Sequence, residues 1–311
     1  MGTASRGRRW LWAILRFPLV RAVIATAAVI GIPNGVGWLA AYVYRTLVPG
    51  AEIPVPALLV LVLALTHVSY VCYVRLIEWR AAEELSPRAM FPDLGWGILT
   101  GACLCGAVVG VLWLLGYYGV TAVNGLAATV PLFAASVVSA YVEEIVARGI
   151  VFRIMEEGLG TWLALAGSAI LFGLVHIFNP NATILGALAI ALTAGVILGA
   201  GYVLTRTLWL PIGIHFAWNF TLGGIFGLAV SGRAGRGFVD AELSGPELLS
   251  GGTFGPEASL FVILFGLPIG GYLLLRAIQR NQIRPPAWSR HPEATDPGGI
   301  ARAARLPTDG N

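Results

Sequence analysis

The sequence predicts an all-α protein, a polytopic bundle of transmembrane helices with about eight spans. Of its 311 residues, 57% are hydrophobic and 12% are charged, whereas soluble domains carry about 25% charged residues. Several uninterrupted apolar stretches are long enough to cross a bilayer. They lack the period-two alternation of a membrane β-barrel. Because lipid-exposed backbone must satisfy its own hydrogen bonds, these stretches should be helices.

Apolar runs and polar breaks divide the chain into three parts. Residues 1–21 form an expected cytoplasmic segment, in which Trp10, Trp12 and Phe17 among arginines indicate an interfacial helix. Residues 22–284 form the transmembrane domain. Residues 285–311, rich in Pro, Gly and polar side chains, are expected to be disordered. The eight expected spans are 22–44, 57–79, 96–117, 125–150, 161–178, 182–204, 208–230 and 258–279.

The distribution of arginine sets the expected orientation. With eight spans, most arginines fall at connections on one side, and by the positive-inside rule both termini should be cytoplasmic. The exception is the loop 231–257, which holds Arg233 and Arg236. The net charge of +4 reflects arginines at span ends, so nucleic acid is not an expected partner. The Ala-, Gly- and Arg-rich composition favours a bacterial plasma membrane, with lipid as the surrounding partner.

Three pairs of glycines four residues apart predict close helix packing. They are Gly106–Gly110, Gly195–Gly199 and Gly266–Gly270. Small residues at this spacing let two helix backbones approach each other within a bilayer. The pattern is common and carries no information about chemistry.

Few ionisable residues lie inside the apolar runs, and those that do are costly and usually functional. The fourth expected span contains Glu143 and Glu144, followed by Arg148. The fifth ends at His176, and the seventh contains His215 and Asn219 four residues apart. Three helices could therefore bring polar groups together in one bundle interior.

The two adjacent glutamates should have different tasks, because neighbouring residues point about 100° apart on a helix. Glu144 and Arg148 have the spacing of an ion pair within one helix. Glu143 then has no local counter-charge and is the better general base in a cavity of low dielectric constant. The alternative is that both carboxylates lie at the headgroup level and end the span.

The whole set has the groups required for hydrolysis of an amide. A carboxylate and an imidazole can activate water, and a second imidazole and an amide can donate hydrogen bonds to an oxyanion. Alternatively, Glu143, His176 and His215 could bind zinc, as in His₂Glu catalytic sites. Taken singly, each histidine could instead be a packing residue, and Asn219 could join two helices.

These motifs resemble those of a known family. Glu143-Glu144-x-x-x-Arg148, Phe172-x-x-x-His176 and His215-x-x-x-Asn219, in this order, are similar to the three motifs of the CPBP family of CAAX proteases and bacteriocin-processing membrane proteins. The run 143–160, with Glu156 and Glu157, and the run 172–176 also resemble it. The core of the resemblance covers roughly 125–225.

The resemblance implies an α-helical intramembrane endopeptidase. In it, Glu143 is the base that activates water, His176 assists, and His215 and Asn219 form the oxyanion site. Glu144, Arg148 and Phe172 are supporting residues. A membrane-bound, lipidated or hydrophobic peptide or protein is the expected substrate. A metal-free glutamate mechanism is favoured, so that no cofactor is expected, with zinc as the alternative.

The positions of the motifs set a condition on the fold. His176 lies near the far end of the fifth span, whereas Arg148 places Glu143 nearer the cytoplasmic end of the fourth. The two depths agree only if the fourth span continues through about Glu157. At about 1.5 Å per residue, both residues then lie roughly 20–25 Å from the cytoplasmic helix ends.

Two further classes of function compete with a protease. A membrane scaffold or immunity protein could keep the fold without turnover, but every motif position here carries its expected residue. A proton-coupled transporter could use Glu143 and the histidines as a relay. That reading is disfavoured because the sequence lacks the repeated halves typical of transporters.

Overall fold

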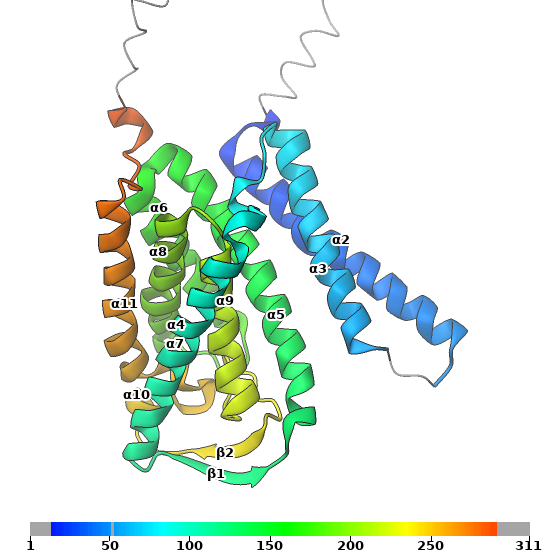
Figure 1. The fold of residues 1–311 in the computed structure, drawn as a ribbon, viewed down its shortest axis with the longest axis vertical. Coiled ribbons are helices and arrows are strands. Elements are labelled where there is room, and N and C mark those ends of the chain that lie inside the picture. The colour runs from blue at the N-terminus through cyan, green and yellow to red at the C-terminus, as the bar shows by residue number, and fades with distance from the viewer. Residues whose placement is uncertain (1–13, 51–52, 291–311) are drawn as a thin grey trace, which may run out of the picture.

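The computed structural model describes residues 14–50 and 53–290, and helices dominate them (Figure 1). The helical segments in chain order are α2 (Pro18–Leu47), α3 (Val55–Tyr73), η1 (Val74–Glu78), η2 (Glu83–Leu85), α4 (Pro87–Leu114), η3 (Leu126–Thr129), α5 (Val130–Glu144), η4 (Ile145–Phe152), α6 (Arg153–Val175), η5 (His176–Phe178), α7 (Ile184–Ile190), η6 (Ala191–Gly195), α8 (Val196–Thr205), α9 (Trp209–Asn219), η7 (Phe220–Ile225), α10 (Glu247–Ser250), η8 (Gly252–Phe254), η9 (Pro256–Ala258), α11 (Leu260–Gln279) and η10 (Ala287–Ser289). The predicted all-α membrane bundle is confirmed.

Six helices of the described residues are long and apolar enough to cross a membrane. They are Pro18–Leu47, Val55–Glu78, Pro87–Leu114, Leu126–Phe178, Ile184–Thr205 and Leu260–Gln279. The stretch Leu126–Phe178 covers the fourth and fifth expected spans together. The seventh expected span corresponds to α9 and η7, which are too short to be counted. The figure of about eight spans therefore stays a prediction.

The helix that begins with α5 continues without a break well beyond Glu143. It passes through the π-helical segment η4 into α6 and turns at Gly160, whose φ of 75° and ψ of 172° are not helical. This is the continuation through Glu157 that the sequence analysis required. At ~1.5 Å per residue, Glu143 and His176 each lie roughly 25 Å from this turn, one before it and one after it. The two antiparallel arms therefore bring both residues to the same depth.

Close packing of α4 on α9 sets the position of two site residues. A Cβ atom on Gly101 would lie 2.3 Å from the carbonyl oxygen of Ile214, and one on Gly97 would lie 2.4 Å from that of Leu210. The two backbones therefore touch, and α9 is wedged between α4 and α5. Another pair, Gly106–Gly110, was predicted wrongly as a packing site.

Around Gly106 and Gly110 nothing lies within 4 Å of an added Cβ, because they face away from the packed side of α4. The other two predicted pairs do lie at helix contacts. The added Cβ atoms would meet Ala169 and Leu165 in the pair Gly195–Gly199, and Ile197 and Val196 in the pair Gly266–Gly270.

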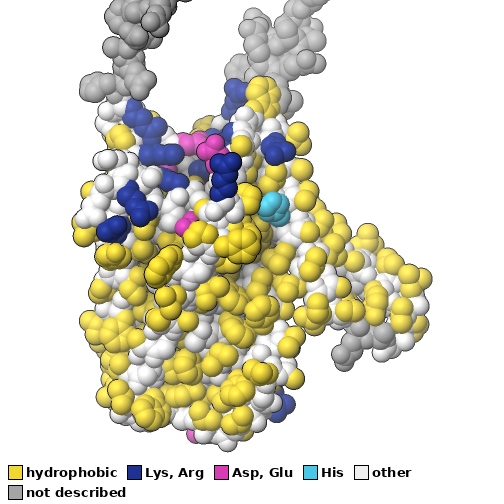
Figure 2. All heavy atoms as spheres, viewed as in Figure 1, with side chains coloured by type: hydrophobic (Ala, Val, Ile, Leu, Met, Phe, Trp, Pro, Cys, Tyr) yellow, Lys and Arg dark blue, Asp and Glu magenta, His cyan; other side chains and the backbone are white. Residues whose placement is uncertain are grey.

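Charged side chains gather at the end of the bundle where both ends of the described chain lie (Figure 1, Figure 2). Arg21 of α2 and Arg153 of α6 both bind Glu78 and Glu157, at 2.5–2.7 Å. The network joins the α2–α3 hairpin to the rest of the bundle. Nearby, burial alone would raise the pKa of Glu84, but hydrogen bonds and charge from Arg80 hold this pKa below its ordinary value.

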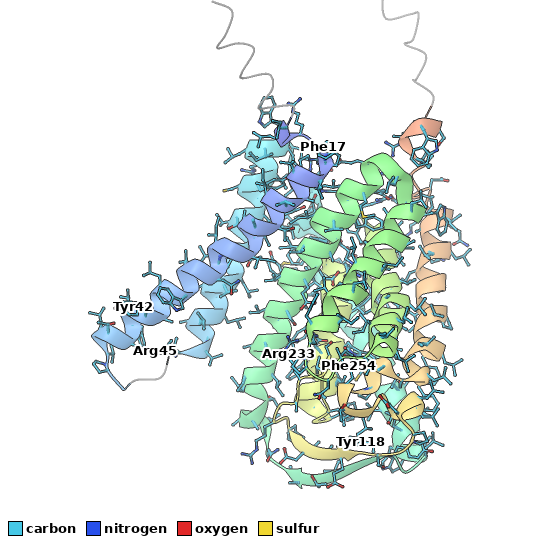
Figure 3. The ribbon with its side chains drawn as sticks, turned by 180° about the vertical axis from the view of Figure 1, so that it is seen from behind. Phe17, Tyr42, Arg45, Tyr118, Arg233 and Phe254 are labelled. Carbon is cyan, nitrogen blue, oxygen red and sulfur yellow. The ribbon has the colours of Figure 1, made fainter. Side chains whose placement is uncertain are left out.

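A small sheet closes the opposite end of the bundle (Figure 1). Its two strands, β1 (Tyr118–Val123) and β2 (Val239–Leu243), pair antiparallel. The sequence did not predict this sheet, because β1 follows an apolar span directly and β2 lies in a loop. The hairpin of α2 and α3 leans away from the bundle toward this end, so that Tyr42 and Arg45 stand apart from it (Figure 3).

Two expected terminal features fall partly outside the described residues. Trp10 and Trp12 of the expected interfacial helix lie outside them, and α2 begins at Pro18. Most of the expected disordered tail, residues 291–311, also lies outside. Residues 285–290 are described and contain η10, and the backbone nitrogen of Thr161 donates to the carbonyl of Arg284 just before them (3.0 Å).

Candidate active site

Glu143 and Glu144 point to different surroundings, as their positions on one helix require. The side chain of Glu144 is fully buried, whereas that of Glu143 is 39% exposed. Glu144 Oε1 lies 2.9 Å from Nη1 of Arg148. The ion pair predicted from the spacing is therefore present, and the alternative of two headgroup-level carboxylates does not describe Glu144.

His215 of α9 lies between the two glutamates. Its Nδ1 is 2.9 Å from Glu144 Oε1, and its Nε2 is 3.9 Å from Glu143 Oε2. Since a carboxylate only accepts hydrogen bonds, Nδ1 is the donor to Glu144. This contact was not predictable from the sequence, because it joins residues 71 positions apart in the chain. Glu144 thus orients the imidazole ring of His215 and also neutralises the charge of Arg148.

Arg148 and the ring of Phe172 pack behind the two imidazoles. Arg148 is buried, and its Nη2 donates to the carbonyls of Ala194 (3.3 Å) and Gly195 (3.2 Å). Its guanidinium lies 4.5 Å from the centre of the Phe172 ring, a cation–π contact. The same ring packs against His176 at 4.8 Å and against His215 at 6.1 Å between ring centres.

His176 is oriented by its own helix. Its Nδ1 lies 2.7 Å from the carbonyl oxygen of Phe172, one turn earlier. A carbonyl oxygen can only accept, so Nδ1 carries the proton of the neutral ring. Its Nε2 is then left as an acceptor. The spacing Phe172-x-x-x-His176 therefore does two things: it packs the two rings together and it places His176 Nδ1 at the carbonyl oxygen of Phe172.

Asn219 lies one turn after His215 and faces α5. Its Nδ2 donates to Oγ of Ser139 at 3.2 Å. The second hydrogen of this amide is free for another acceptor. Ser139 was not singled out in the sequence, where a serine in a helix carries no distinguishing signal, yet it fixes the plane of the amide.

One cavity of about 590 Å³ joins all four candidate residues, and we call it the site cavity. Glu143, His176, His215 and Asn219 all line it. Its remaining wall is mostly apolar and comes from α5, η4, α6 and the turn after η7. The four candidate residues thus share one pocket with a mostly apolar wall, the usual form of a small-molecule or peptide site.

The site cavity borders surfaces that face lipid. Its lining includes Ile30 of α2 and Leu171 and Val175 of α6, and these side chains are 42%, 47% and 65% exposed. A second, mostly apolar hollow lies between α2 and η4 and shares Ile30 and Val151 with it. A chain embedded in the bilayer can therefore reach the site from the side.

The zinc alternative requires three donor atoms around one point. Over residues 14–50 and 53–290, no three side chains of His, Cys, Asp or Glu come together as a metal site would require. Glu143, His176 and His215 line the same cavity, but they do not converge as three ligands on one point. The metal-free mechanism and its zinc alternative both stay predictions.

One cavity of this helical membrane bundle thus contains a carboxylate, two imidazoles and an amide. These are the side chains of a hydrolase-like site. Residues 125–221 match the family model described as "Type II CAAX prenyl endopeptidase Rce1-like". Over these residues the chain is similar to the Rce1-like family, as the three motifs predicted. No curated protein and no solved structure matches the chain.

The matched segment contains every candidate site residue, from Glu143 to Asn219. The match supports a membrane protein of a protease type, the CAAX prenyl endopeptidases. The hairpin of α2 and α3, the sheet-end loops and α11 lie outside the match.

Proposed function

We propose that the protein is an intramembrane endopeptidase in which Glu143 activates a water molecule against a peptide bond. The observation that carries the proposal is the site cavity, which exposes Glu143 beside both imidazoles while Glu144 is buried beneath them. Glu143 takes the proton of the water as general base and returns it to the leaving amine. Glu144 does not share this task, because its carboxylate is fully buried and its Oε1 binds both Arg148 and His215.

His176 orients the water in this mechanism. With Nδ1 bonded to the carbonyl of Phe172, the lone pair of Nε2 can accept a hydrogen bond from the water. Glu143 and His176 then act on the same molecule from two antiparallel helical arms. The pairing resembles the way other hydrolases hold a nucleophilic water between two basic groups.

His215 and Asn219 stabilise the oxyanion that forms as water attacks the carbonyl. Asn219 donates with the amide hydrogen that Ser139 does not use. His215 donates from Nε2, which requires the doubly protonated ring because Nδ1 is committed to Glu144. Donors fixed in place before the reaction stabilise this charge without reorganisation, which is commonly the largest catalytic term.

The substrate is a membrane-associated peptide or protein. Its apolar part enters between α2 and α6, where the lining residues of the site cavity are exposed to lipid. A lipidated or hydrophobic peptide satisfies this requirement, and a soluble, highly charged peptide does not.

Elemental analysis together with chelation tests the metal-free mechanism. The purified protein in liposomes is expected to cleave its substrate without stoichiometric metal and to keep its activity in EDTA. One zinc per chain, lost with activity on chelation and restored by added zinc, would contradict the glutamate mechanism.

A further inference from the structure

A smaller cavity of about 50 Å³ meets the site cavity at the candidate site residues, and we call it the inner cavity. His176, His215 and Asn219 line both cavities. Glu143 lines only the site cavity, whereas the rest of the inner cavity is formed mainly by side chains of α4, η6, α8, α9 and α11. The two imidazoles and the amide therefore lie at the boundary between the two cavities.

The inner cavity has a buried carboxylate of its own, that of Glu257. This residue belongs to η9, is 9% exposed, and lies outside the segment that matches the family model. Its Oε1 accepts a hydrogen bond from Nε1 of Trp218 at 2.9 Å. Its Oε2 accepts from the backbone nitrogen of Ser231 and, at 2.9 Å, from the hydroxyl of the same residue. Within residues 14–50 and 53–290, Glu257 forms no ion pair, so neutral donors alone hold this carboxylate.

Both the size and the polar groups of the inner cavity suit water. One water molecule requires a cavity of roughly 10–15 Å³ and roughly two to four polar partners, so about 50 Å³ has room for a few molecules. A carboxylate has about four accepting positions, and three of those on Glu257 are occupied, which leaves one on Oε1. Nε2 of His176 and Oδ1 of Asn219 are also acceptors, and neither has a hydrogen-bond partner in the described part of the chain.

The proposed reaction consumes one water molecule for each bond that is cut. The water oxygen bonds to the carbonyl carbon, the carbon–nitrogen bond breaks, and one proton passes through Glu143 to the leaving amine. The site cavity has a mostly apolar wall that borders lipid-facing side chains, so a bound substrate covers this side of the site with apolar groups. The water that attacks is therefore best held elsewhere on the protein before the substrate binds.

We propose that the inner cavity is a binding site for water, held by Glu257, and that it supplies the nucleophilic water while substrate fills the site cavity. The inference rests on the proposed function, because it takes Glu143 and His176 as the groups that act on this water. Glu257 is then a positioning residue. It binds the stored water and does not touch the substrate.

X-ray radiolysis of the wild-type protein in lipid nanodiscs tests for this water directly. Radicals that form from a bound water molecule oxidise the side chains that it touches. Trp218 lines the inner cavity, whereas Trp209 of the same helix lines neither cavity, and the two are almost equally buried (8% and 9% exposed). We expect Trp218 to be oxidised several-fold faster than Trp209. Equal rates in a preparation that cleaves substrate, with no cleavage by Glu143→Gln, would overturn the inference and leave the proposed function intact.

Two variants test whether the stored water takes part in the reaction. Ala194 is half-buried and lines only the inner cavity, so Ala194→Val fills part of that volume. Glu257→Gln keeps the shape of the side chain and removes its charge. Each variant should slow the oxidation of Trp218 and lower kcat several-fold with little change in KM. The matched control is Ala102→Val, at a half-buried alanine of α4 that lines neither cavity, and it should change none of these values.

The combination of the two readouts separates a supply of water from a role in packing. A normal kcat in Ala194→Val, with oxidation of Trp218 reduced, would overturn the supply role. A lower kcat in both variants, with oxidation of Trp218 as in wild type, would assign the loss to packing and also overturn the inference. Glu143→Gln should lose cleavage but keep the wild-type oxidation of Trp218, because Glu143 does not line the inner cavity. The comparison of the two tryptophans in wild type needs no variant to fold.

Discussion

At the scale of single residues, Glu144 connects a buried ion pair, with Arg148, to a candidate site residue, His215. It is fully buried and binds both Arg148 and His215 through one oxygen, Oε1. Its other oxygen has no hydrogen-bond partner within the described part of the chain. The ion pair was predictable from the i, i+4 spacing. The bond to His215 was not, because it depends on how α9 packs against α5.

Glu144→Gln is expected to destabilise the protein. The change leaves the buried guanidinium of Arg148 without a counter-charge, and breaking a buried pair costs about 3–5 kcal/mol. The unfolding temperature in detergent should fall well below that of wild type. Glu143→Gln, at a partly exposed carboxylate, is the matched control and should unfold like wild type. Equal unfolding temperatures for the two variants would contradict the structural role of Glu144.

Asn219→Ala is expected to lower turnover with little change in substrate binding. Loss of one oxyanion donor typically costs about 10²–10³ in rate. Ser139→Ala removes the group that fixes the amide plane, so it should give a smaller loss in the same parameter. Steady-state kinetics on a reconstituted substrate measures both. A change confined to KM in Asn219→Ala would place this residue in binding rather than in the oxyanion site.

At the scale of elements, the sequence predicted which segments are helical but not how the helices touch. The apolar runs located the helices, and the condition on the fourth span required a helix continuing through about Glu157, which the structure contains. The glycine contacts were harder to predict, because a G-x-x-x-G pattern does not say which face a helix buries. Gly97 and Gly101 have the same spacing as Gly106 and Gly110, yet the first pair alone meets a neighbouring backbone.

Gly101→Ala is expected to lower both the stability and the cleavage activity of the protein, because it displaces α9. The added methyl group would lie 2.3 Å from the carbonyl oxygen of Ile214, which forces α9 and its candidate site residues away from α4. Overpacking of this kind costs about 1–3 kcal/mol. Thermal unfolding and cleavage assays should both show the loss. Gly106→Ala, whose methyl group meets nothing within 4 Å, should show neither, and a loss there as large as that of Gly101→Ala would refute the packing argument.

At the scale of the whole molecule, the bundle has two different ends. The charged network and both ends of the described chain lie at one end, and the sheet lies at the other (Figure 1, Figure 2). Hydropathy did not predict the sheet, because it is built from contacts between segments far apart in the chain. The distribution of arginines predicts that the first end is cytoplasmic.

Cysteine labelling tests this orientation. In a background without Cys72, Cys103 and Cys105, Ser289→Cys and Ser244→Cys each place one thiol at an exposed position, at opposite ends of the bundle. A membrane-impermeant maleimide applied to intact cells should label Ser244→Cys, and Ser289→Cys should react only after the membrane is opened. Labelling in the reverse order would place both termini outside and the sheet end in the cytoplasm.

The most direct test of the central claim compares the membrane peptides of cells that contain wild-type protein with those of cells that contain Glu143→Gln. Glutamine keeps the shape of the side chain and removes the base, so the variant should reach the membrane in normal amount. Mass spectrometry is expected to find hydrophobic precursors that accumulate uncut in the variant and are shortened in wild type. Identical peptide sets, with both proteins folded and equally abundant, would contradict the assignment of Glu143 as the catalytic base.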